Sequence, residues 1–189
     1  VRALSSDQLN SLSSDQFSTL ETRDIAALSS AQFAALNTSA VVALTTAQVK
    51  ALTSAALNAM SSDQIASLET EDLAALTTGQ VSKLNTLQVS LLSTGQIVAL
   101  TTAQVQALKT VQIAALSSDQ INTMESDDLQ SLSSAQIRAL TSDQLGAVSS
   151  DQLLLLTTGQ VQALSTMQIT SLTSDQLNSL SSDEIDALT

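Results

Sequence analysis

The sequence predicts an all-α repeat solenoid built from very short helices, one for each eight-residue repeat. Three observations predict this class. Leucine recurs at every eighth residue from Leu4 to Leu188, with methionine or valine in its place at only three positions. A second apolar residue follows five positions later in every complete repeat, from Leu9 to Ile185. A hydroxyl residue followed three residues later by glutamine recurs in most repeats. Such a fixed period is the signature of a repeat architecture.

The repeat, here called an octad, runs along the whole chain without insertion or deletion. We therefore expect residues 1–189 to form a single continuous array with no internal boundary. Val1 and Thr189 both lie inside octads, and neither end shows a polar capping repeat. We expect the chain to be a fragment of a longer array or a subunit of a filament.

Two other architectures conflict with the eight-residue period. In one long α-helix, successive leucines would drift by roughly 80° around the axis and would form no apolar face. In a β-solenoid, leucine and the second apolar residue, five positions apart, would point to opposite faces of a strand. The sequence also lacks proline and contains only four glycines, which disfavours many tight turns.

Short helices fit the local signals, in order along the chain. Ser5-Ser6-Asp7-Gln8 is a capping box, in which the first hydroxyl caps the helix and the glutamine reaches back. Equivalent boxes recur at multiples of eight residues in most octads and reach Ser181. Acidic residues such as Asp7 fall in the first turn, where the helix dipole favours them. Each helix is too short to be stable alone, so packing on neighbouring octads must hold it.

Three octads share one particular departure from the capping box. They carry Glu at the first position and Asp three residues later: Glu21 with Asp24, Glu69 with Asp72, and Glu125 with Asp128. We expect the hydroxyl residue that follows each Glu to cap these helices instead.

The number of helices in each coil is predicted from a weaker pattern. Unusual residues at the first position tend to recur every sixteen residues, as at Glu21, Asn37, Glu69 and Asn85. This alternation favours two helices per coil and an elongated, two-layered rod.

The repeated apolar positions identify the expected core and the exceptions to it. Representative core residues are Leu100, Val105, Leu108, Ile113, Leu116 and Ile121. Other apolar residues occupy positions that are polar or small in most octads, and they are candidates for lateral contact between rods: Leu91, Val98, Leu154 and Leu155.

Composition excludes several classes of function. The chain has no histidine or cysteine, and its lysines are isolated, so we expect no catalytic site, no metal site and no cofactor. A formal charge of −12 argues against nucleic acid as a partner. No apolar run approaches the roughly 20 residues that span a bilayer, so we expect no membrane insertion.

The motif Leu-Thr-Thr-Ala-Gln-Val-Gln-Ala-Leu at residues 100–108, with relatives at 44–52, 76–81 and 156–164, resembles octapeptide tracts of large repetitive bacterial proteins. Those proteins are described as adhesin-like, secreted or surface-exposed. The resemblance implies an extracellular or cell-surface location and a structural role.

Three functions remain open at this stage. The first is a spacer, stalk or self-assembling fibre element that associates end to end or side by side. The second is a scaffold that binds a protein or glycan through its variable positions: Arg2, Asn10, Lys50, Gln106, Gln130 and Arg138. The third is an ice-binding solenoid that uses its rows of Ser and Thr.

Overall fold

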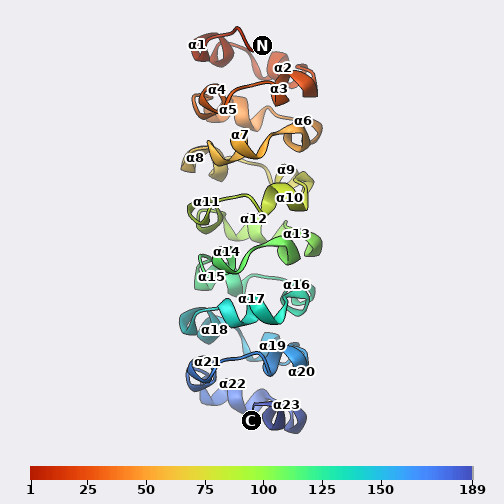
Figure 1. Ribbon diagram of the computed structural model, residues 1–189, viewed down its shortest axis with the longest axis vertical. Helices are drawn as coiled ribbons and strands as arrows, with labels where there is room; N and C mark the ends of the chain where they lie inside the picture. Colours follow the sequence, from red (N-terminus) through yellow and green to blue (C-terminus); the bar gives the residue numbers. More distant parts are fainter. Residues whose placement is uncertain (189) are drawn as a thin grey trace. The chain divides into compact units, whose positions relative to one another are not determined.

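The computed structural model describes residues 1–188. Within these residues the chain forms 23 short α-helices, one for each octad, and no strand (Figure 1). The all-α repeat solenoid predicted from the sequence is therefore confirmed.

The chain divides into two compact units, Val1–Leu100 and Thr101–Thr189, although the octad pattern continues through the boundary. The helices of the first unit are α1 (Ser6–Asn10), α2 (Ser14–Ser18), α3 (Thr22–Ala26), α4 (Ser30–Ala34), α5 (Thr38–Val42), α6 (Thr46–Ala51), α7 (Ser54–Asn58), α8 (Ser62–Ala66), α9 (Thr70–Ala75), α10 (Thr78–Val81), α11 (Thr86–Ser90) and α12 (Thr94–Val98). Those of the second unit are α13 (Thr102–Ala107), α14 (Thr110–Ile113), α15 (Ser118–Asn122), α16 (Ser126–Ser131), α17 (Ser134–Ala139), α18 (Ser142–Ala147), α19 (Ser150–Leu153), α20 (Thr158–Val161), α21 (Thr166–Thr170), α22 (Ser174–Ser179) and α23 (Ser182–Ala187).

Each helix begins where the sequence places its capping box. In α1 the Ser5 hydroxyl accepts a hydrogen bond from the Gln8 backbone N–H at 3.2 Å, and the Gln8 side chain accepts one from the Ser5 N–H at 2.8 Å. These contacts satisfy two of the N–H groups that a helix start leaves without a partner. The capping-box prediction is confirmed at this helix and at most others of both units; α3, α5, α7, α9 and α16 lack the box.

The connections between helices explain why so few glycines are needed. Leu52 (φ −59°, ψ 133°) and Thr53 (φ −72°, ψ 152°) link α6 to α7 with extended backbone that any residue can adopt. No residue in the described part of the chain has a positive φ. The change of direction thus comes from two extended residues rather than from a tight turn.

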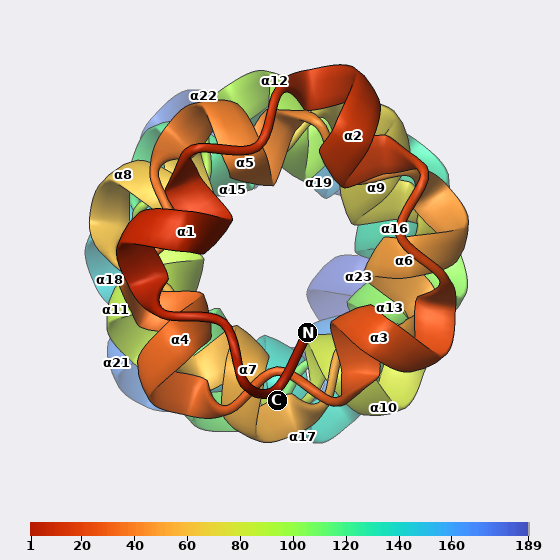
Figure 2. The same ribbon diagram turned by 90° about the horizontal axis from the view of Figure 1, so that it is seen from above.

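Within each unit, a helix packs on the third helix along the chain. In the first unit, α3 packs on α6, α6 on α9, and α9 on α12. In the second unit, α13 packs on α16, α15 on α18, and α18 on α21. In Figure 2, α1, α2 and α3 occupy successive positions around a ring before α4 comes round to the side of α1.

The predicted coil of two helices is therefore wrong, since each turn holds between three and four octads. A two-helix coil would need each connection to reverse the chain. The extended connections rotate it by only a quarter to a third of a circle. The residues that recur every sixteen positions lie at the helix start, and they do not determine how far each connection turns the chain.

The two apolar positions of the octad pack against different neighbouring turns of the solenoid. The first leucines, Leu4, Leu12 and Leu20, are half-buried, and Leu28 in the fourth octad is the first that is buried. Near the other end the pattern reverses: Leu180 is buried, whereas Ile185 is 41% exposed. Leucine thus packs toward the preceding turn, and the second apolar residue packs toward the following one.

The six residues expected in the core are all buried, from Leu100 to Ile121. The four candidates for lateral contact lie on the surface, where Leu91, Val98, Leu154 and Leu155 are 36–45% exposed. Two adjacent leucines show the difference between core and surface positions within one octad. Leu153, the last residue of α19, is fully buried, whereas Leu154, the C-cap of this helix, is 45% exposed.

Leu153→Ala and Leu154→Ala form a matched pair that tests this arrangement. Leu153→Ala should destabilise the protein by about 2–4 kcal/mol, because it leaves a cavity between turns. Leu154→Ala should change stability by less than about 1 kcal/mol. Urea denaturation followed by circular dichroism measures both. Equal losses of stability in the two variants would contradict the packing described above.

Candidate functional site

The polar group that joins one turn to the next is the glutamine at the fourth position after leucine. Gln96 shows the arrangement, with 3% of its surface exposed. Its Oε1 accepts a hydrogen bond from the backbone N–H of Ser93 at 2.8 Å. Its Nε2 donates to the carbonyl oxygens of Ile65 at 3.1 Å and Leu68 at 2.8 Å. One side chain therefore caps its own helix and binds the end of a helix in the preceding turn.

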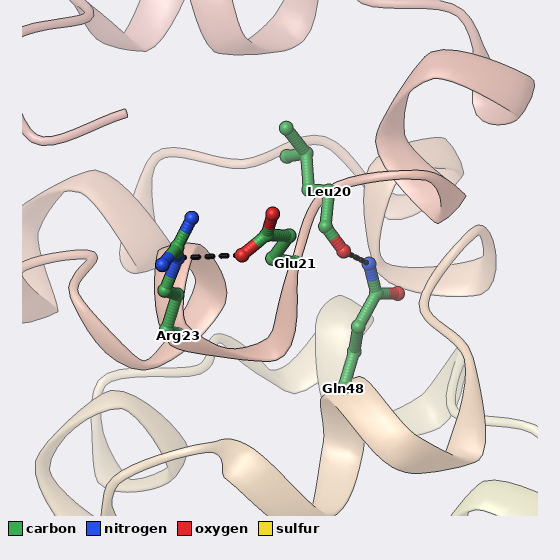
Figure 3. A network of polar contacts seen from close by, with 4 residues as sticks. All are labelled: Leu20, Glu21, Arg23 and Gln48. Carbon is green, nitrogen blue, oxygen red and sulfur yellow. Dashed lines mark hydrogen bonds and ion pairs between the residues drawn. The ribbon is translucent and has the colours of Figure 1, made fainter.

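This contact repeats at a constant spacing within each unit, and we call the set of such residues the glutamine ladder. Each member donates to a carbonyl 28 residues earlier, at 2.6–3.2 Å. Figure 3 shows one such bond, from Gln48 to the carbonyl of Leu20. Its members include Gln32, Gln48, Gln64, Gln80, Gln88 and Gln96 in the first unit and Gln136, Gln144, Gln152, Gln160, Gln168 and Gln176 in the second.

The chemistry of the amide explains why glutamine holds this position. A carboxamide is neutral, accepts through its oxygen and donates through two N–H groups. The carbonyls at the end of a helix have no partner within that helix. Glutamine satisfies an N–H at the start of one helix and carbonyls at the end of another, so no charge has to be buried. In the described residues, no buried side-chain nitrogen or oxygen lacks a hydrogen-bond partner.

A second polar contact points the other way along the chain. Arg2 Nε donates to the Ala27 carbonyl at 3.0 Å, Asn10 Nδ2 to Ala35 at 2.8 Å, and Arg138 Nε to Ala163 at 3.3 Å. Each of these residues lies two positions before a leucine of the repeat and reaches a carbonyl 25 residues later.

This contact changes the interpretation of the variable positions that sequence analysis assigned to ligand recognition. Arg2, Asn10 and Arg138 bind the next turn of their own unit. The other three, Lys50, Gln106 and Gln130, have exposed side chains. These internal contacts could not be predicted from the residues alone, because the partner is a backbone carbonyl in a distant octad.

The octads with Glu and Asp in place of the capping box behave differently from the rest. The N-caps of α3, α9 and α16 are the glutamates themselves, and none of them makes a side-chain capping bond. The expectation that the following hydroxyl residue caps these helices is therefore wrong, since Thr22, Thr70 and Ser126 are already the first helical residues. On the surface beside α3, Glu21 pairs with Arg23 (Figure 3).

Two of these aspartates are buried, with Asp72 and Asp128 each 3% exposed. Burial, together with the negative charges of Glu69 and Glu71, raises the pKa of Asp72 to about 6. Burial also raises the pKa of Asp128; a hydrogen bond from the Thr102 side chain opposes this change.

The described surface offers few features that are typical of binding or catalytic sites. Its two best-defined hollows are shallow and open, and the smaller, of about 450 Å³, lies beside Glu69 and Ser93. Among the described residues, no three acidic side chains converge to hold a metal ion. None of the helices described is long and apolar enough to cross a bilayer.

The short helices stack in successive turns, and the glutamine ladder joins the turns. These features define the chain as a repeat solenoid protein built from octads. The ALTTAQ repeat matches residues 17–54, 65–102, 97–124, 121–158 and 155–189, and the chain belongs to this family. The six letters occur as such at Ala43–Gln48 and Ala99–Gln104, from the residue before the leucine to the glutamine at the fourth position after it. No curated protein matches the chain.

Gln96→Leu should remove the contacts of one ladder residue while keeping its approximate volume. We expect a loss of about 2–4 kcal/mol, because buried carbonyls and a buried N–H lose their partners. Gln8→Leu is the matched control, since Gln8 is exposed and makes only the capping contacts of α1. Its cost should be about 1 kcal/mol or less. Urea denaturation compares the two variants, and similar costs would mean that the contacts between turns contribute little.

Proposed function

We propose that this chain is an extended structural element that acts as a spacer, stalk or fibre component. The observation that supports this most strongly is the constant 28-residue spacing of the glutamine ladder. Successive turns offer equivalent carbonyls to the next turn, and glutamines in most octads present amides to the previous one. An array with this property can grow by adding octads without any new kind of contact.

The same contacts support end-to-end association as the route to longer assemblies. Gln8 and Gln16 lie in the first turn of the described residues, and their side chains make only the capping contacts of their own helices. At the other end, Ile185 is 41% exposed. A neighbouring turn, from the same chain or from a second copy, would cover both surfaces with ladder bonds and apolar contacts.

An extracellular or cell-surface location is also part of the proposal. Its support is the resemblance of the octads to tracts in adhesin-like bacterial proteins. A chain without cysteine needs no reducing compartment, and its −12 charge keeps an exposed array hydrated.

Adding octads to the chain tests the spacer function. A second copy of residues 45–100 inserted after Leu100 adds seven octads, or about two turns. Small-angle X-ray scattering should show the maximum dimension increasing by about 20 Å, since stacked helices lie roughly 9–10 Å apart.

The control for this experiment carries the same inserted residues in scrambled order, which should form a flexible segment, so that scattering shows a broad distribution of distances instead of a defined increment. If the octad insert instead increased the radius of gyration only as a compact globule would, the spacer function would be contradicted.

Lateral association through the exposed leucines is tested separately. The double variant Leu154→Gln, Leu155→Gln should reduce self-association of the chain, because it removes an apolar surface. Met167→Gln is the control, since Met167 is 75% exposed and lies outside the proposed contact. Sedimentation velocity over a concentration series measures the effect. Equal association of both variants and the unchanged chain would exclude this surface.

A further inference from the structure

Helix α11 in the first unit carries an exposed pair of leucines close to a lysine. Leu87 is 62% exposed, and Leu91, the C-cap of the helix, is 37% exposed. The Leu91 N–H donates to the Leu87 carbonyl at 3.1 Å, so the two residues lie one helical turn apart on one face. Exposed Lys83 precedes Leu87 by four residues, and residues 73–118 contain no acidic residue. We call Lys83, Leu87 and Leu91 the lysine patch.

Helix α19 in the second unit carries a similar pair of leucines close to an acid. Leu154 and Leu155 are 45% and 36% exposed. Asp151 lies exposed in the first turn, three and four residues before them, so it is their neighbour on the helix surface. The segment 119–151, which ends at this aspartate, holds six acidic residues and one arginine. We call Asp151, Leu154 and Leu155 the aspartate patch.

Packing within a unit does not account for either patch. Val89 and Leu153, fully buried at the second apolar position, already supply the core side chains of these two helices. The exposed leucines stand at positions that are polar or small in most octads. Among the described residues, neither Lys83 nor Asp151 has an ion-pair partner. Grouped apolar residues on the surface of a soluble protein typically mark a contact with another molecule.

We infer that the lysine patch of one copy packs on the aspartate patch of a second copy, with leucines against leucines and Lys83 opposite Asp151. Charge complementarity selects this partner, because two like patches would bring two lysines or two aspartates together. The −12 charge of the chain opposes contact between the acidic surfaces of two copies. This inference rests on the proposed function as a fibre component, and it names the surfaces through which copies meet side by side.

Exchange of the two charges tests the ionic part of this contact. Lys83→Glu and Asp151→Lys each place like charges opposite one another, and each should weaken self-association of the full chain about three- to tenfold. The variant with both substitutions restores opposite charges and should recover the affinity of the unchanged chain. Lys50→Glu is the control, because it changes the net charge as Lys83→Glu does at an exposed site on α6. Sedimentation velocity over a concentration series measures the four variants.

A mixing experiment tests whether unlike patches pair. One variant carries Leu87→Gln and Leu91→Gln, and the other carries Leu154→Gln and Leu155→Gln. Each alone should self-associate more than about tenfold more weakly than the unchanged chain, because it lacks one apolar surface. An equimolar mixture should form a one-to-one dimer, since each variant supplies the patch that the other lacks. Circular dichroism checks that both variants keep the fold, which we expect because all four leucines are exposed.

Three results would overturn the inference: an unchanged chain that stays monomeric at every concentration, an exchange of charges that recovers no affinity, or a mixture that remains monomeric. The spacer function is tested apart from this contact. If the chain is monomeric but the octad insert still lengthens it, the spacer function stands and only the contact between patches is lost.

Discussion

The amide of a buried glutamine is the group on which the rest of this structure depends. Helices of four to six residues have as many unsatisfied backbone groups at their ends as satisfied ones inside them. An isolated helix of this length is unstable in water. The ladder glutamines join the start of one helix to the end of another, so two sets of end groups are satisfied together. Apolar burial supplies the attraction between turns, and the amides fix which octads face each other.

This arrangement also accounts for the composition of the chain. The direction of the backbone changes through two extended residues, so the fold needs neither proline nor glycine at its corners. Each octad contributes two side chains to the core, the leucine and the second apolar residue, and the narrow core leaves little space for aromatic rings. Phe17 and Phe33 are the exceptions, buried at the second apolar position. Acidic residues occupy the glutamine position only at Asp24, Asp72, Asp128 and Glu184, and burial raises the pKa of Asp72 and Asp128.

Much of the local structure could be predicted from the sequence, because its causes lie within one octad. The capping box from Ser5 to Gln8 is such a case, as is the burial of Leu100 and Val105. The number of octads per turn could not be predicted. It depends on backbone angles at residues such as Leu52, which leave no mark in the side chains. The second role of glutamine was also missed, since its partners are carbonyls of distant and nearly identical octads.

The most direct test of this account is hydrogen exchange of the glutamine side-chain amides, observed by NMR. If the ladder holds the turns together, the Nε2 protons of Gln64 and Gln96 should exchange far more slowly than those of Gln8 and Gln106. Slow exchange for the first pair alone is the result that the account predicts. Equally fast exchange at all four residues would contradict it.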